Sequence, residues 1–203
     1  AQNALGHNPF ILNRMESYIG VMIDDLVTKG TQEPYRMFTS RAEYRLLLRQ
    51  DNADARLMGK GRKLGLVSNE TYDRCLKKLN SVKNEIDRLN ETRVTPNLEG
   101  MELVSQLGIR ELKNTTTLAG LLKRPEITYN RLIETFNGAM VPPLVGEQVE
   151  IQIKYEGFIQ RQKQVVAKQA KLENYAIPKD FQYNGIPGLS REVVQKLEAI
   201  RPA

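Results

Sequence analysis

The sequence predicts a mainly α-helical fold, an irregular helical bundle with room for one small strand pair. Two observations predict it. Apolar residues recur at helical spacing along most of the chain, and no stretch of any length alternates strictly between apolar and polar residues. The 203 residues suffice for one large domain or two small ones. We expect an arginine-rich first part over residues 1–66 and a helical domain over residues 67–203.

The first predicted helix begins near Arg14 and ends at Gly30. Its apolar residues recur every three or four positions, which is typical of an amphipathic helix. These residues are Tyr18, Ile19, Met22, Ile23, Leu26 and Val27.

An arginine-rich segment follows, which we define as residues 33–49 (EPYRMFTSRAEYRLLLR) and call the arginine segment. Ser40 and Glu43 have the spacing of a capping box, in which a hydroxyl and a carboxylate bind backbone N–H groups at a helix start. A helix that begins at Ser40 would carry three arginines on one face, four residues apart. These are Arg41, Arg45 and Arg49.

Like charges at this spacing repel, so the row requires an anion or compensating carboxylates. A phosphate backbone would supply the first, and Glu43 or Asp51 could supply the second. The helix alone leaves the two interpretations equal. Neighbouring cations shift the balance toward phosphate binding, and two tyrosines could stack on a base or simply pack. The cations are Arg36, Arg56, Lys60, Arg62 and Lys63, and the tyrosines are Tyr35 and Tyr44.

Further helices are predicted downstream. Residues 51–54 (DNAD) either break the arginine helix or start a short one, and three nearby glycines indicate a loop. The loop glycines are Gly59, Gly61 and Gly65. Ser68 then starts a long amphipathic helix that ends near Asn90. The remaining predicted helices cover residues 99–107 (closed by Gly108), 117–122, 125–136, 147–175 (with Gly157 inside) and 191–200 (capped by Ser190).

The charge balance favours an anionic partner. The chain has 30 Lys and Arg against 24 Asp and Glu, a net charge of +6 and a pI near 9.4. No apolar run is long enough to span a bilayer and no signal peptide opens the chain, so we expect a cytoplasmic protein. One cysteine excludes an intrachain disulfide framework.

Several kinds of catalytic site are excluded. Cys75 lies among apolar residues of a predicted helix and is interpreted as a small core residue, while His7, the one histidine, is too near the terminus to pair with it. A zinc site would need more Cys or His ligands. The acidic pair Asp24–Asp25 is interpreted as a solvated helix end. The chain also lacks a glycine-rich dinucleotide fingerprint and a phosphate loop.

The arginine segment, continued to Ala53, closely resembles the signature of the MnmG family, also called GidA. Four other stretches, in the same order along the chain, resemble the family too. They are residues 18–28 (YIGVMIDDLVT), 124–129 (RPEITY), 149–162 (VEIQIKYEGFIQRQ) and 188–194 (GLSREVV). The resemblance spans nearly the whole chain.

The resemblance implies an FAD-dependent tRNA-modifying enzyme, with NADH as reductant. Such enzymes are dimers that work with the GTPase MnmE to install a carboxymethylaminomethyl group at C5 of the wobble uridine. This chain looks like the family's C-terminal helical region, with residues 1–66 including the junction with the FAD domain. The FAD fingerprint and catalytic cysteines would lie upstream, and the last helices, which bind MnmE, would follow Ala203. We therefore expect no catalytic, cofactor-binding or metal-binding residue in this chain, and no flavin chemistry from it alone.

The resemblance also implies tRNA phosphate contacts in and beside the arginine segment, close to the active cleft. The candidate residues are Arg36, Arg41, Arg45 and Arg49, followed by Lys60, Arg62 and Lys63. Each would position the tRNA rather than read a base. The alternative is a pure protein-interaction module that docks on the flavin domain and on MnmE, for which the long helix over 147–175 and the terminal helix over 191–200 would provide the surface.

Overall fold

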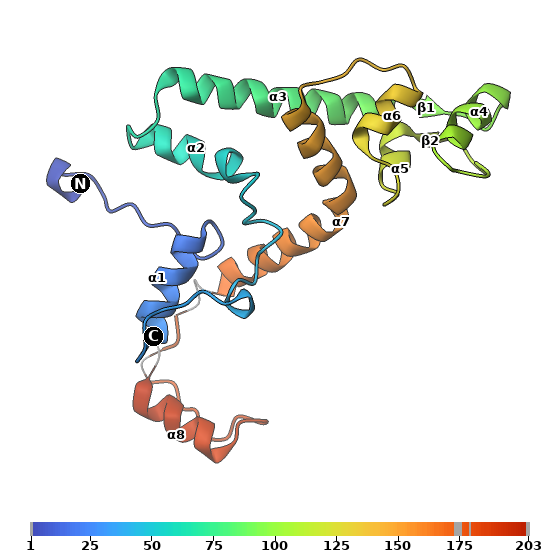
Figure 1. Ribbon diagram of the computed structural model, residues 1–203. Coiled ribbons are helices and arrows are strands. Elements are labelled where there is room, and N and C mark those ends of the chain that lie inside the picture. Colours follow the sequence, from blue (N-terminus) through green and yellow to red (C-terminus); the bar gives the residue numbers. More distant parts are fainter. Residues whose placement is uncertain (1, 173–175, 179, 202–203) are drawn as a thin grey trace. The chain divides into compact units, whose positions relative to one another are not determined.

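The computed structural model describes residues 2–172, 176–178 and 180–201, in two compact units that divide after Gln162. The predicted mainly α fold is confirmed. The described residues contain eight α-helices and one antiparallel pair of two-residue strands (Figure 1). The strand register pairs Arg93 with Thr117 and Val94 with Thr116.

Helix α1 spans Tyr18–Thr28, after a short 3-10 helix at Asn3–Leu5. Ser17 caps α1, because its Oγ accepts a hydrogen bond from the backbone N–H of Gly20 at 3.0 Å. Gly30, at φ 64°, follows the end of the helix, as predicted. Several of its apolar side chains remain exposed, among them Ile19, Ile23 and Val27.

The helix predicted from Ser40 to Arg49 is absent, and the capping box prediction is wrong. A single 3-10 turn, Thr39–Arg41, ends at Ala42, whose φ of −104° and ψ of 84° are not helical. A tight turn follows, in which Leu47 and Leu48 both donate backbone N–H groups to the Tyr44 carbonyl. Arg41, Arg45 and Arg49 therefore do not share a helical face.

The loop predicted around the glycines at 59 and 61 is also wrong, because these residues lie inside helix α2, Ala53–Lys63. Gly61 permits a close approach here: a Cβ at this position would be 2.9 Å from a methyl carbon of Val67. The turn begins only at Gly65, whose φ is 74°.

Helix α3 is the long helix predicted after Ser68, and it spans Asn69–Glu91. Ser68 caps it through a hydrogen bond from the Thr71 N–H. The shorter elements are β1 (Arg93–Val94), α4 (Leu98–Gln106), β2 (Thr116–Thr117), α5 (Leu118–Leu122) and α6 (Tyr129–Thr135). Helix α6 begins four residues later than the predicted start at Pro125, because Thr128 provides the cap.

Helix α7, Pro143–Leu172, is the predicted long helix and includes Gly157; its predicted end near Tyr175 lies outside the described residues. Its first half packs Val145, Val149 and Ile153 into the core that α3, α4, α5 and α6 also line. Among the described residues, none of the helices combines the length and apolar character that a membrane crossing requires.

The second unit contains helix α8, Arg191–Ile200, which Ser190 caps as predicted. Before it, the rings of Phe181 and Tyr183 meet edge to face, with centroids 5.3 Å apart. Tyr183 is buried.

Candidate nucleic-acid interface

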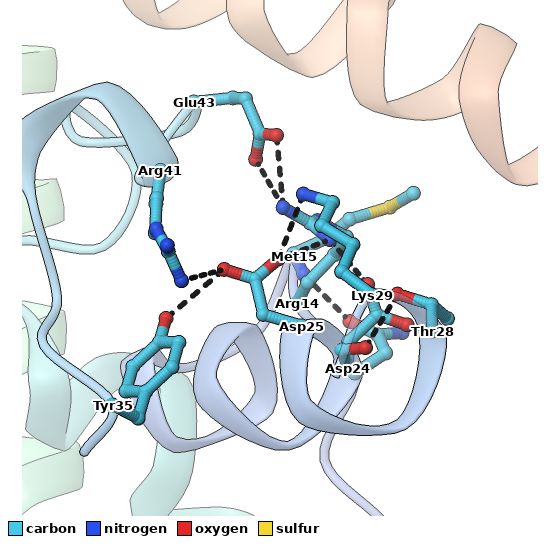
Figure 2. Close-up of polar contacts among 10 residues, drawn as sticks. Arg14, Met15, Asp24, Asp25, Thr28, Lys29, Tyr35, Arg41 and Glu43 are labelled. Carbon is cyan, nitrogen blue, oxygen red and sulfur yellow. Dashed lines mark hydrogen bonds and ion pairs between the residues drawn. The ribbon is translucent and has the colours of Figure 1, made fainter. Parts of the chain in front are cut away.

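The carboxylate of Asp25 joins α1 to the arginine segment, with a side chain that is only 1% exposed (Figure 2). Its Oδ1 accepts a hydrogen bond from Lys29 Nζ at 3.0 Å and lies 3.4 Å from Arg14 Nη1. Its Oδ2 accepts a hydrogen bond from the Tyr35 hydroxyl at 3.0 Å and lies 3.8 Å from Arg41 Nη1. One oxygen therefore faces the α1 side and the other faces the arginine segment.

These contacts correct the interpretation of Asp24–Asp25 as a solvated pair, which is wrong for Asp25. The hydrogen bond from Lys29 lowers the pKa of Asp25; burial opposes it, and Tyr35 and Arg14 add to the lowering. The net pKa lies below the ordinary value, so the group is ionised at neutral pH. Asp24 is 39% exposed and pairs with Arg14.

Arg14 explains why the capping box does not form. Its Nη2 donates to both carboxylate oxygens of Glu43, at 2.8 and 3.0 Å, so Glu43 is turned toward Arg14 and not back toward Ser40. Ala42 and Tyr44, on either side of Glu43, are buried, so the backbone is held on both sides of this residue in a non-helical conformation. A tertiary ion pair and local burial thus replace the local helix start.

Arg36 and Arg41 lie beside aromatic rings. The Arg41 guanidinium is 5.0 Å from the centroid of the Tyr35 ring and 5.9 Å from that of Phe38. The Arg36 guanidinium is 5.6 Å from the same Phe38 ring and is exposed. All three distances are in the range of cation–π contacts, which orient a guanidinium without neutralising it.

Arg45 is exposed and has no ion pair or hydrogen bond with any residue that the structure describes. Arg49 differs. Its Nε donates to Asp51 Oδ1 at 3.0 Å and its Nη1 to the Leu46 carbonyl at 2.6 Å, and only 17% of its side chain is exposed. Arg45 can therefore accept an external anion directly, whereas Arg49 is held within the fold.

The second group of predicted cations is also divided. Lys60 forms an ion pair with Glu16, and Arg56 donates to the Glu16 backbone carbonyl. Arg62 and Lys63 are exposed in the last turn of α2, and neither has an ion-pair partner in the described part of the chain. Of the seven predicted residues, Arg36, Arg45, Arg62 and Lys63 are thus exposed without a carboxylate partner.

Two glutamines of α7 bind in and just beyond the arginine segment, and neither was identified as a contact from the sequence. The buried Gln148 donates Nε2 to Asp51 Oδ2 at 2.8 Å, and Gln162 donates Nε2 to the Glu43 carbonyl at 3.2 Å. Fourteen residues separate them, close to four helical turns, so both project from nearly the same face of α7. A polar residue at a core-facing position was the one available signal for Gln148.

The arrangement provides exposed guanidinium groups beside aromatic rings on a segment that is fixed from both sides. It is suited to hold phosphate groups, which Arg can bind through two parallel hydrogen bonds. The described residues contain no cluster of His, Cys, Asp and Glu that could hold a metal ion. Cys75 is buried, as predicted, and burial raises the pKa of its thiol, so it is not an activated nucleophile.

Most of the chain matches two models of known protein families. Residues 69–163 match the family described as "tRNA modifying enzyme MnmG/GidA C-terminal helical domain", and residues 165–203 match "tRNA modifying enzyme MnmG/GidA C-terminal helical bundle".

Two similar relatives carry the name "tRNA uridine 5-carboxymethylaminomethyl modification enzyme MnmG". The one from Geobacter sulfurreducens is 52% identical over 97% of this chain and 32% of its own length. The one from Listeria monocytogenes is 47% identical over 100% of this chain and 32% of its own length. The chain thus spans about a third of the length of these relatives.

Among solved structures, GidA of Aquifex aeolicus in its form II crystal is similar, with a TM-score of 0.73 and 41% sequence identity. The match covers 98% of this chain and 31% of that one. The form I crystal gives a TM-score of 0.69.

Proposed function

This chain belongs to the MnmG/GidA family, as part of its C-terminal helical region, and we propose that it binds tRNA for a flavin-dependent tRNA-modifying enzyme. In this proposal the whole enzyme is an FAD-dependent, NADH-reduced dimer. It works with the GTPase MnmE in the cytoplasm and installs a carboxymethylaminomethyl group at C5 of the wobble uridine. The chain contributes tRNA and partner binding, not flavin chemistry.

The observation that carries the proposal is the state of the arginine segment. Arg36 and Arg45 are exposed without a carboxylate partner, although the same segment folds Arg49 onto Asp51. A guanidinium that has no carboxylate partner and extends from a fixed backbone can donate its hydrogen bonds to an external anion. The net charge of +6 adds a long-range attraction to a polyanion.

Arg36, Arg41 and Arg45 act by binding phosphate oxygens and setting the orientation of the RNA. Phe38 is 50% exposed between Arg36 and Arg41 and provides a face on which an unstacked base can lie. Arg62 and Lys63, both exposed in the last turn of α2, extend the contact. Arg49 and Lys60, in contrast, support the fold around the interface.

The described residues do not fit FAD. No glycine-rich turn joins a strand to a helix in the described part of the chain, and Gly59 and Gly61 lie inside α2. FAD would therefore be bound by other parts of the whole enzyme, and no step of the flavin reaction is assigned to residues of this chain.

The test is tRNA binding to the 203-residue chain as a function of salt. Replacing Arg45 by Ala removes one phosphate contact, so we expect affinity to fall roughly three- to tenfold and the slope of log K against log salt to decrease by about 0.7–0.9. Arg74→Ala is the matched control, because Arg74 is also exposed but lies on α3. Unchanged affinity and slope for Arg36, Arg41 and Arg45 variants alike would exclude the proposal.

The second candidate is a protein-interaction module. Exposed apolar side chains support it: Ile23 and Val27 on α1 are 47% and 78% exposed, and Phe158 on α7 is 55% exposed. In this alternative these faces dock on the flavin domain or on MnmE.

Charge reversal on α7 separates the two candidates. Lys163→Glu with Lys168→Glu should abolish binding to purified MnmE but leave tRNA affinity within about twofold if the helix is a partner surface. If binding to MnmE persists unchanged, this face of the helix is only solvated.

A further inference from the structure

We propose that Asp25 is a positioning residue for tRNA binding: its buried carboxylate sets the place of Arg41 and Tyr35 relative to α1. The inference rests on the proposed tRNA-binding function and adds to it a residue that does not touch RNA. Asp25 is the least exposed member of the network in Figure 2.

The two oxygens of Asp25 have different partners, and this division supports the proposal. Oδ1 faces Lys29, the residue that directly follows α1, and Arg14, which precedes α1. Oδ2 faces Tyr35 and Arg41, both of the arginine segment. A carboxylate that served α1 alone would have no need of the second pair.

Tyr35 adds a second restraint on Arg41. Its hydroxyl donates to Oδ2 at 3.0 Å, and its ring lies 5.0 Å from the Arg41 guanidinium. Asp25, Tyr35 and Arg41 therefore form a closed set of three contacts. Arg41 remains 38% exposed, so a guanidinium that is fixed from behind still presents donors to solvent.

The charge of Asp25 taken alone predicts the opposite effect on binding. A carboxylate close to a phosphate-binding surface repels the RNA, so removing its charge should strengthen binding if the charge were all that mattered. A positioning role predicts weaker binding, because Arg41 and Tyr35 lose their common acceptor. The sign of the change in affinity therefore distinguishes the two.

The first experiment compares Asp25→Asn with Asp73→Asn in tRNA binding. Asp73 is exposed on α3, so its replacement makes the same change in net charge far from the network in sequence. We expect Asp25→Asn to weaken binding roughly three- to tenfold and to lower the salt slope by about 0.7–0.9, as if one phosphate contact were lost. Asp73→Asn should leave affinity equal or slightly higher. Unchanged or tighter binding by Asp25→Asn would overturn the inference.

A double-mutant comparison tests whether Asp25 acts through Arg41. In an Arg41→Ala background, Asp25→Asn should cause little further loss, because the group that it positions is already absent. Full additivity of the two losses would show that Asp25 acts on something else and would overturn the inference.

If Asp25→Asn fails to fold, Tyr35→Phe tests the positioning role of Asp25 instead. It removes only the hydrogen bond to Oδ2 and keeps the ring beside Arg41, so we expect a smaller loss of affinity that also disappears in the Arg41→Ala background. Binding by Tyr35→Phe equal to the unmodified chain would count against positioning. If Arg45→Ala weakens binding while these variants do not, the proposed function stands and only the role of Asp25 fails.

Discussion

Gln148 of α7 donates its side-chain Nε2 to Asp51 Oδ2 at 2.8 Å and so joins two residues that are 97 positions apart in the chain. Asp51 in turn accepts hydrogen bonds from Arg49, the last residue of the arginine segment. The helix whose first half packs into the core therefore also holds the end of the candidate interface. Burial raises the pKa of Asp51. The hydrogen bonds from Arg49 and Gln148 lower this pKa by more than burial raises it, so the net pKa is below the ordinary value.

The Gln148–Asp51 contact predicts the effect of placing a second carboxylate there. Gln148→Glu should lower the free energy of unfolding by about 2 kcal/mol, because a buried donor is replaced by a like charge next to Asp51. Urea unfolding at pH 7 measures it. Gln152→Glu is the matched control, since Gln152 is exposed one turn later on the same helix and its change should stay within about 0.5 kcal/mol. Equal effects of the two substitutions would mean that Gln148 does not hold Asp51.

Local signals predicted most of the helices. Ser68 and Ser190 cap α3 and α8 at the predicted residues, and Gly30 and Gly108 have positive φ after α1 and α4. These features depend on a few neighbouring residues, so the sequence contains the information needed to place them.

The arginine segment could not be predicted in the same way. Ser40 and Glu43 match a capping box, but Glu43 binds Arg14, 29 residues earlier, and this partner is not visible in the local pattern. Asp25 was interpreted as solvated for the same reason, because its acceptor role depends on Tyr35 and Arg41 from another segment. Tertiary contacts of this kind override local propensity.

A buried carboxylate in α3 gives a pH-dependent prediction. Glu85 is 6% exposed and accepts hydrogen bonds from Arg88 at 2.6 Å and from the Tyr129 hydroxyl at 2.6 Å. Burial raises the pKa of Glu85. The hydrogen bonds from Arg88 and Tyr129 lower this pKa by more than burial raises it, so the net pKa is below the ordinary 4.5. Ionised Glu85 stabilises the folded state, and this contribution is complete when the pH is above the ordinary pKa of 4.5. The contribution is lost as the pH falls through the lowered pKa that Glu85 has in the folded state.

Glu85→Gln should therefore be less stable than the unmodified chain by about 1–3 kcal/mol at pH 7, and this difference should shrink as the pH falls below 4.5. Urea unfolding at pH 7 and near pH 3 measures both values. Glu91→Gln, at an exposed position of α3, serves as control and should change stability by no more than about 0.5 kcal/mol at either pH. A difference for Glu85→Gln that stays constant with pH would contradict the ionised Glu85.

Two glycines of α7 predict opposite effects of the same substitution. At Gly146 an added Cβ would lie 2.7 Å from Cδ1 and 2.9 Å from Cε1 of the Tyr129 ring. That ring cannot easily move, because it is buried and its hydroxyl is bonded to Glu85. Gly146→Ala should therefore destabilise the chain by about 1–3 kcal/mol.

At Gly157 an added Cβ would meet no atom within 4 Å. Gly157→Ala should stabilise the chain by about 0.5–1 kcal/mol, since alanine restricts the unfolded backbone and favours the helix. Thermal or urea unfolding of the two single variants measures the contrast, and each is the control for the other because both make the same chemical change in one helix. If Gly146→Ala were as stable as Gly157→Ala, the Tyr129 ring would have to be free to shift, and the hydrogen bond from Tyr129 to Glu85 of α3 could not be what holds this ring in place beside Gly146.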